Sequence, residues 1–307
     1  MRITVLESIE MTHEQRRELD ALGTVQWYES SSDEEAAKRI IGADVVVVDW
    51  IDPSPFILKM KNPSLVALMS TGYAWIQHRP EARKQGVLIC NIPGYATEAV
   101  AEHVLGLALC VARQTMVGDR AIRSGKKEKG YLRGIELKGR TWGIIGLGQI
   151  GSRVAELAKA LGTRVIAYNR SPKNVRGVKE VPLEELLSSS DVVSICCPLN
   201  ADSKAMLTHK HLDLMKRDAI LVGATWGVVD LDALTQILSE ARIRGAGFDV
   251  AVEGGKIDLS TSLLGLDNIV LTPHIAYNTG EAKIRQVNQC ISNMMAFLQG
   301  KPINVVN

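Results

Sequence analysis

The sequence predicts an α/β protein built from two doubly wound parallel sheets. The chain of 307 residues is too long for one ordinary hydrophobic core and suits two domains of about 150 residues each. Apolar, β-branched runs alternate with capped, amphipathic segments, a pattern typical of parallel strands joined by helices. The alternation starts again near residue 141, so the two halves of the chain are expected to share one architecture.

In the first hundred residues, strands are expected where apolar residues run together. Helices are expected where a capping residue opens a polar segment that ends in glycine. The run ADVVVVDW at 43–50 is apolar through its centre, as expected of a strand buried on both faces. The expected elements are strand 2–7, helix 12–23, strand 24–29, helix 31–42, strand 43–50, strand 65–72, helix 79–86 and strand 87–94.

A long helix is expected at 97–115. It is apolar nearly all round, which predicts burial between domains or subunits. A polar, basic stretch follows as far as Lys138 and is interpreted as solvated. An amphipathic helix at 279–300 ends the pattern. The strands of the second half are expected at about 141–146, 164–168, 191–196, 219–223, 244–248 and 268–271.

The composition argues against several classes of protein. A net charge of +2 gives no basic surface for nucleic acid, and no apolar run reaches the roughly 18 residues of a membrane span. The chain enters a strand at once, without an export signal, so a cytoplasmic protein is expected. Neither the six histidines nor the cysteines have metal-binding spacing. The five cysteines are expected to be buried, reduced thiols: Cys90, Cys110, Cys196, Cys197 and Cys290.

A glycine-rich turn carries the first functional signal. Gly146, Gly148 and Gly151 form a GxGxxG pattern between an apolar strand and a helix, and the strand TRVIAY follows. These glycines would permit a tight turn, the approach of a pyrophosphate, and close packing of helix and strand, respectively. The N–H groups of Gln149 and Ile150 would face the phosphates at the positive end of the helix. The pattern predicts a dinucleotide-binding domain.

The residues after the second strand of this domain indicate which dinucleotide is bound. Asn169 stands where an NAD site usually places Asp or Glu on the ribose hydroxyls, and Arg170 and Ser171 follow it. A carboxylate would repel a 2′-phosphate, whereas Asn, Arg and Ser can bind one through charge-assisted hydrogen bonds. NADP(H) is therefore favoured. NAD(H) stays open if Arg170 is only a solvated turn residue.

Together, the motifs resemble those of the D-isomer-specific 2-hydroxyacid dehydrogenase family, which includes glyoxylate and hydroxypyruvate reductases. The matching segments follow the order of the family over nearly the whole chain. They are NIPGYATEAVAEHVLGLAL at 91–109, ELKGRTWGIIGLGQIG at 136–151, DVVSICCPLN at 191–200, GAGFDV at 245–250 and LTPHIAYNT at 271–279.

This resemblance implies a split layout. A flavodoxin-like substrate domain would comprise residues 1–96 and 276–307, and an NAD(P)-binding Rossmann domain, residues 97–275, would be inserted into it. The resemblance also implies a small-molecule substrate and a homodimer built around helix 97–115.

The resemblance assigns ligand-binding positions as well. The aspartate that matches Asp249 would hold the nicotinamide carboxamide. A loop from Ser70 through Thr71, Gly72 and Tyr73 would offer backbone amides to the substrate carboxylate. The positions that would line the cofactor groove are Cys197, Pro198, Ser203, Ala224 and Thr225.

Family members use three catalytic side chains, and this sequence clearly keeps one of them. His274 in TPHIA matches the histidine that protonates the developing alkoxide. The glutamate that orients this histidine is expected five residues after Asp249, where Gly254 stands. Glu253, one position earlier, takes that role if the glycine loop turns it toward His274. Trp226 occupies the position of the arginine that polarises the carbonyl group and anchors the carboxylate.

The presence of Trp226 at this position bears on which substrate the protein would reduce. Tryptophan offers one N–H donor and a large apolar face, but no charge. Loss of a preorganised donor at an oxyanion lowers the rate about 10²–10³-fold, so ordinary 2-oxo acid reduction should be poor. We expect an NADPH-dependent reductase with atypical specificity, for a bulkier or less anionic carbonyl or for an imine. Trp226 would then contact the substrate.

Two alternatives stay open. The chain could be an ordinary glyoxylate- or hydroxypyruvate-type reductase that recruits another cation, with Arg79 as the nearest candidate in the sequence. It could also be a nucleotide-sensing binding protein with little or no turnover, since the C-terminal-binding-protein corepressors use this fold in that way.

Overall fold

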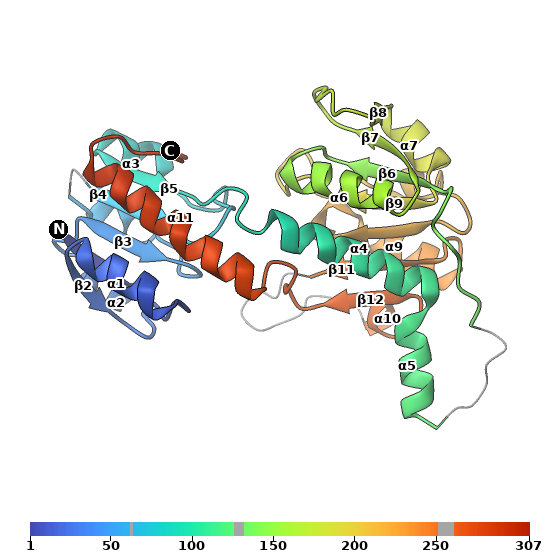
Figure 1. Cartoon of the computed structure of the whole chain (residues 1–307), viewed down its shortest axis with the longest axis horizontal. Coiled ribbons are helices and arrows are strands. Elements are labelled where there is room, and N and C mark those ends of the chain that lie inside the picture. The colour runs from blue at the N-terminus through green and yellow to red at the C-terminus, as the bar shows by residue number, and fades with distance from the viewer. Residues whose placement is uncertain (62–63, 126–131, 251–260) are drawn as a thin grey trace. The chain divides into compact units, whose positions relative to one another are not determined.

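The computed structural model describes residues 1–61, 64–125, 132–250 and 261–307 (Figure 1). The chain divides into two compact units, Met1–Ala96 with Asn278–Asn307, and Thr97–Tyr277. Each unit holds one parallel sheet flanked by helices, which confirms the predicted α/β class with two doubly wound sheets. The second unit ends two residues after the domain boundary expected at residue 275.

The first unit is a five-stranded sheet in the order β2-β1-β3-β4-β5. All four residues of its central strand β3 are buried. Val45 and Val47 pack into one hydrophobic cluster, and Val46 and Val48 into another, because successive side chains of a strand point to opposite faces. The elements are β1 (Arg2–Val5), α1 (His13–Ala21), β2 (Thr24–Trp27), α2 (Asp33–Arg39), β3 (Val45–Val48), η1 (Ile57–Lys59), β4 (Ser64–Leu68), α3 (Arg79–Lys84), β5 (Val87–Cys90) and α11 (Gly280–Leu298).

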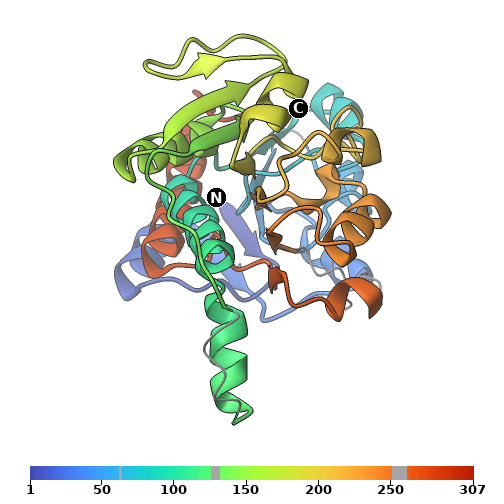
Figure 2. The ribbon, with the colours of Figure 1, turned by 90° about the vertical axis from the view of Figure 1, so that its right-hand side faces the viewer.

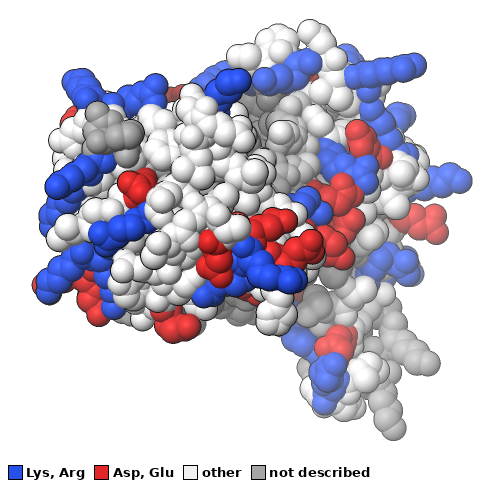
Figure 3. Space-filling model, turned by 60° about the vertical axis from the view of Figure 1, so that its left-hand side comes forward, with Lys and Arg blue, Asp and Glu red and all other residues white. Residues whose placement is uncertain are grey.

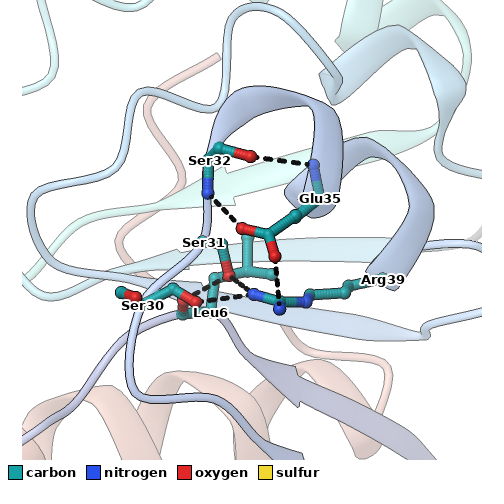
Figure 4. Close-up of polar contacts among 6 residues, drawn as sticks. All are labelled: Leu6, Ser30, Ser31, Ser32, Glu35 and Arg39. Atoms are coloured by element: carbon teal, nitrogen blue, oxygen red, sulfur yellow. Dashed lines mark hydrogen bonds and ion pairs between the residues drawn. The ribbon is translucent and has the colours of Figure 1, made fainter.

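Helix α2 shows how local sequence sets an element boundary. The Ser32 hydroxyl accepts a hydrogen bond from the Glu35 N–H, and the Glu35 carboxylate accepts one from the Ser32 N–H (Figure 4). This capping box satisfies two N–H groups that a helix start would otherwise leave unpaired. The hydrogen bonds to Ser32, together with nearby Arg39, lower the pKa of Glu35.

The second unit is a seven-stranded sheet in the order β12-β11-β10-β9-β6-β7-β8. The strand order reverses between β6 and β9, and ligands of such sheets bind at the carboxyl ends of the strands at this point. The elements are α4 (Thr97–Arg113), α5 (Thr115–Arg123), β6 (Thr141–Ile145), α6 (Gln149–Ala160), β7 (Arg164–Tyr168), β8 (Lys179–Glu180), α7 (Leu183–Ser189), β9 (Val192–Ile195), α8 (His209–Leu212), β10 (Ile220–Gly223), η2 (Trp226–Val228), α9 (Leu231–Ser239), β11 (Gly245–Asp249), α10 (Thr261–Leu264) and β12 (Ile269–Thr272).

The region after α4 differs from the expectation of a plain polar stretch. Helix α4 ends at Arg113, Gln114 adopts a left-handed φ of 54°, and the chain bends by 63° into the helix α5. Figures 1 and 2 show α5 extending away from the sheet, and none of its residues is buried. Its sequence is amphipathic, but its apolar side chains, among them Met116 and Ile122, are exposed instead of packing on the sheet.

Three features of the described part of the chain concern membranes, metal ions and surface charge. No single helix there has the length and hydropathy of a membrane span, although α4 and α5 pass that test as a bent pair. No group of three or more His, Cys, Asp or Glu side chains there is placed to hold a metal ion. On the face shown in Figure 3, positive and negative side chains are interspersed.

Candidate active site

The glycine-rich turn lies where β6 meets α6. Gly146 has a φ of 98°, and a Cβ there would lie 2.6 Å from the Cys197 backbone nitrogen. A Cβ on Gly151 would overlap the Gly146 carbonyl oxygen, so this helix turn can pack against the strand end only without a side chain. By contrast, a Cβ on Gly148, the N-cap of α6, would meet nothing within 4 Å. The space in front of Gly148 and the open helix N-terminus fit a dinucleotide pyrophosphate.

Asn169 connects this turn to the end of β7. Its Oδ1 accepts a hydrogen bond from the Leu147 N–H at 3.0 Å, and its Nδ2 donates to the Ser171 carbonyl oxygen. The next residue, Arg170, is 78% exposed and pairs with Asp202 at 2.6 Å. Asn169 is therefore held rigidly, while the Arg170 guanidinium stands in solvent beside the turn.

The segment after β9 lies against the same turn. The Ser203 hydroxyl donates to the Pro198 carbonyl oxygen at 2.7 Å and accepts from the Asn200 N–H at 2.9 Å, which fixes the loop. Burial raises the pKa of the Cys197 thiol, which therefore stays protonated at neutral pH. Cys197, Pro198 and Ser203 thus form an uncharged wall beside the Gly146 turn.

Trp226 begins the short helix η2 after β10. Its side chain is half-buried and packs on the hydrophobic cluster formed around β9, β10 and α9. The Ala205 N–H donates to the Gly227 carbonyl oxygen, and Asp230 caps α9 by accepting from the Ala233 N–H at 3.0 Å. Ala224 and Thr225, which connect β10 to this turn, are also half-buried. The indole therefore stands on a firmly anchored turn at the carboxyl edge of the sheet.

Asp249 and His274 are joined through the backbone. The Asp249 carboxylate is 1% exposed and accepts hydrogen bonds from the Ile275 N–H at 3.0 Å and the Ala276 N–H at 2.8 Å. His274 itself is exposed and has a left-handed φ of 53°. Since non-glycine residues adopt this conformation only when their surroundings hold it, Asp249 acts as a clamp on the turn that presents His274.

Two neighbours of Asp249 were not among the residues singled out in the sequence. The Thr272 hydroxyl donates to Asp249 at 2.5 Å, and His103 of α4 lies 2.9 Å from that hydroxyl through Nε2. Thr272 belongs to the same LTPHIAYNT segment as His274, so the sequence motif could have pointed to it. No sequence motif could have pointed to His103, because only the fold brings α4 against β12. Glu253, proposed as the partner of His274, lies outside the described residues.

The expected substrate loop lies in the first unit, after β4. The Thr71 hydroxyl donates to the Ile92 carbonyl oxygen at 3.0 Å, and Asn91 donates to the Thr71 carbonyl oxygen at 2.8 Å. Within the described residues, the N–H groups of Gly72 and Tyr73 make no hydrogen bond. Arg79, considered as a replacement cation, donates to the carbonyl oxygens of Ile76 and Val306 and lies over the Tyr73 ring.

Comparisons with known proteins agree on one family. Residues 105–276 match the model of the D-isomer specific 2-hydroxyacid dehydrogenase NAD binding domain. A glyoxylate reductase of Korarchaeum cryptofilum is 37% identical over 88% of this chain and 84% of its own. A glycerate dehydrogenase of Methylorubrum extorquens is 35% identical over 91% of this chain and 90% of its own.

A solved structure is also similar over the full length of both chains. It is described as an acyclic imino acid reductase in complex with NADPH and D-Arg, and it matches with a TM-score of 0.90 and 32% identity. Together with the family model and the two curated relatives, this similarity shows that the chain belongs to the D-isomer specific 2-hydroxyacid dehydrogenase family of NAD(P)-dependent oxidoreductases.

Proposed function

We propose that the chain is an NADPH-preferring reductase that acts on the imine of a 2-oxo acid better than on the 2-oxo acid itself. The observation that carries this proposal is Trp226, which stands on a hydrogen-bonded turn at the carboxyl edge of the second sheet. By the resemblance of the surrounding sequence, this is the position expected for the arginine of the family. The similarity to an acyclic imino acid reductase supports the same substrate class.

The charge of the substrate explains why tryptophan would suit an imine. An imine is commonly protonated, and a guanidinium would repel that cation. The face of an indole attracts a cation by about 0.5–2 kcal/mol. A 2-oxo acid gains nothing from this attraction and instead develops negative charge on oxygen, where a cationic donor is needed. Trp226 would therefore discriminate between the two substrates through the sign of the charge at the reacting group.

NADPH would be bound along the carboxyl edge of the second sheet. The Gly146–Gly151 turn would hold the pyrophosphate, with the N–H groups of Gln149 and Ile150 directed at it. Arg170, Ser171 and Asn169 would surround the 2′-phosphate. The cofactor groove would be lined after β9 by Cys197, Pro198 and Ser203, and after β10 by Ala224 and Thr225. A contact between Asp249 and the nicotinamide carboxamide stays a prediction. The Asp249 oxygens accept hydrogen bonds from the turn that carries His274.

In the proposed reaction, bound NADPH supplies a hydride to the imine carbon. His274 would supply the proton that converts the imine nitrogen to its iminium form, and the hydride added to the carbon of this cation would complete the amine, so one proton and one hydride are consumed. The free N–H groups of Gly72 and Tyr73, with that of Thr71, would bind the substrate carboxylate, as short N–H donors at a turn are suited to do. Asp249 would hold the His274 turn in place.

The test is a turnover assay with purified protein. Loss of NADPH and NADH absorbance is followed with glyoxylate, hydroxypyruvate and phenylpyruvate, each with and without excess methylamine or ammonium, and the amine product is identified by mass spectrometry. We expect turnover that requires the amine, prefers NADPH and is lost in His274→Ala. Equal turnover without amine would contradict the imine assignment. Tight NADPH binding with no turnover would instead support the nucleotide-sensing alternative.

We also propose a homodimer that uses α4 and α5. Leu109, Met116 and Ile122 expose large apolar side chains on these helices, and Ile122 is 74% exposed. Met116 also lines a pocket of about 240 Å³, together with Cys110 and Val117. Exposed large apolar side chains beside such a pocket are typical of a surface covered by a partner.

A further inference from the structure

The exposed ion pair between Arg170 and Asp202 spans the ligand-binding edge of the second sheet. Arg170 follows β7 and Asp202 follows β9, and the strand between them in the sheet is β6, which leads into the glycine-rich turn. The carboxyl ends of parallel strands lie at one edge, so the ion pair crosses the point where the strand order reverses. Its two atoms are 2.6 Å apart, and the side chains are 78% and 74% exposed.

The two partners differ in how firmly they are held. The Asp202 N–H donates to Asn200 Oδ1 at 2.9 Å, and the Ser203 N–H donates to the same oxygen at 3.1 Å. Asp202 thus belongs to a loop whose backbone is fixed. Among the residues that the structure describes, Arg170 is held through its guanidinium alone, on a long side chain that can turn to another anion. The carboxylate is the stationary partner, and the guanidinium is the one that can move.

We infer that Asp202 is a specificity-determining residue that competes with the cofactor 2′-phosphate for Arg170. This inference rests on the proposed preference for NADPH. To bind a 2′-phosphate, Arg170 must leave the carboxylate, and NADPH affinity is lowered by the strength of that ion pair. NADH, which has no 2′-phosphate, does not require the exchange. Asp202 therefore lowers the ratio of NADPH affinity to NADH affinity, which leaves NADH usable as a second cofactor.

The size of the effect follows from the exposure of the pair. An exposed Arg–Asp pair changes an equilibrium constant by a factor of up to about 5, and salt screens it further. Asp202→Asn keeps the shape of the side chain and removes its charge. We expect this change to tighten the binding of NADPH and of adenosine 2′,5′-bisphosphate by about 2- to 5-fold at low salt, and to leave NADH and AMP binding unchanged.

The experiment is isothermal titration calorimetry of the full chain with these four ligands at about 0.01 M salt, where screening is weak. The variants are Asp202→Asn, Arg170→Ala and the double variant. Asp213→Asn is the matched control, because Asp213 is also an exposed carboxylate paired with an arginine, Arg242, at 3.4 Å, with His209 as a second neighbour at 3.0 Å. These residues precede β10 and β11, so the control pair lies at the opposite edge of the same sheet.

If Asp202 competes with the phosphate, Asp202→Asn should increase NADPH affinity in the wild-type background but not in the Arg170→Ala background. The control Asp213→Asn should leave NADPH affinity unchanged. An equal gain in both backgrounds would overturn the inference and indicate simple repulsion between Asp202 and the phosphate. Weaker NADPH binding by Asp202→Asn would overturn it by showing that Asp202 positions Arg170. If Arg170→Ala leaves the ratio of NADPH to NADH affinity unchanged, the proposed cofactor preference itself fails, which is a separate result.

Discussion

The substitution Asp249→Asn tests the clamp that holds the His274 turn. The carboxylate accepts three hydrogen bonds, from the Thr272 hydroxyl and from the N–H groups of Ile275 and Ala276. Asparagine replaces one acceptor oxygen with an NH₂ group, which must then face a donor. Ala276 is 4% exposed, so its N–H would find no water if it lost its partner.

The magnitude follows from these bonds. One buried N–H left unpaired costs about 1–3 kcal/mol, and the remaining bonds lose about 1 kcal/mol because their acceptor is no longer charged. We therefore expect a loss of about 2–4 kcal/mol in the free energy of unfolding of the second unit. For a domain of this size, that lowers the unfolding midpoint by roughly 4–16 °C.

Thermal unfolding followed by circular dichroism measures the stability of the variant, and the pH dependence of kcat measures the positioning of His274. Asp191→Asn is the control, since Asp191 also binds a backbone N–H, that of Thr141 at 2.8 Å, but at the amino edge of the sheet. It should lose stability and keep the wild-type pH profile. An Asp249→Asn variant with unchanged midpoint and unchanged pH profile would refute the clamp.

Three further predictions concern pH, the glycine-rich turn and assembly. Burial, with Glu7 adding to it and Lys283 opposing it, raises the pKa of Asp49 from 3.8 to about 6. Between these two pKa values the folded state holds a proton that the unfolded state releases, so the free energy of unfolding falls by on the order of 2 kcal/mol as pH rises from about 4 to 6. Denaturant unfolding of Asp49→Asn should not show this decrease in the free energy of unfolding. Gly148→Ala should keep the wild-type unfolding midpoint but weaken NADPH binding about tenfold, because the added methyl group would occupy space needed by the pyrophosphate. Gly151→Ala should lower the unfolding midpoint, because its methyl group would overlap the Gly146 carbonyl oxygen. Ile122→Asp should convert a dimer to a monomer in light scattering, and a wild-type mass for this variant would remove α5 from the interface.

Patterns that depend on local sequence were predictable from it. The strand at Val45–Val48 was found because burial on both faces requires an unbroken apolar run. The glycine-rich turn was found because its three positions exclude side chains for separate reasons, two of them visible as steric overlaps in the fold. In both cases the physical constraint acts within a few neighbouring residues, so a short segment of the sequence is enough to reveal it.

Features that depend on contacts between distant segments were not predictable. Helix α5 buries none of its residues, and Gln114, which adopts the left-handed conformation between α4 and α5, is not the glycine that would mark such a break in the sequence. The clamp joins Asp249 to a turn more than twenty residues later, and Asp202 meets Arg170 across thirty-two residues. Sequence alone indicated that Asp249 and Arg170 matter, but only the fold shows which groups they bind.

The central claim is that Trp226 selects an imine over a 2-oxo acid, and the most direct measurement is kcat/KM for both substrates in wild type and in Trp226→Arg. Trp226→Phe serves as the control, because it keeps an aromatic face without adding charge. We predict that Trp226→Arg raises 2-oxo acid reduction about 10²-fold and lowers imine reduction, while Trp226→Phe keeps the wild-type order. If Trp226→Arg leaves the ratio of the two activities unchanged, Trp226 does not determine the substrate and the account is wrong.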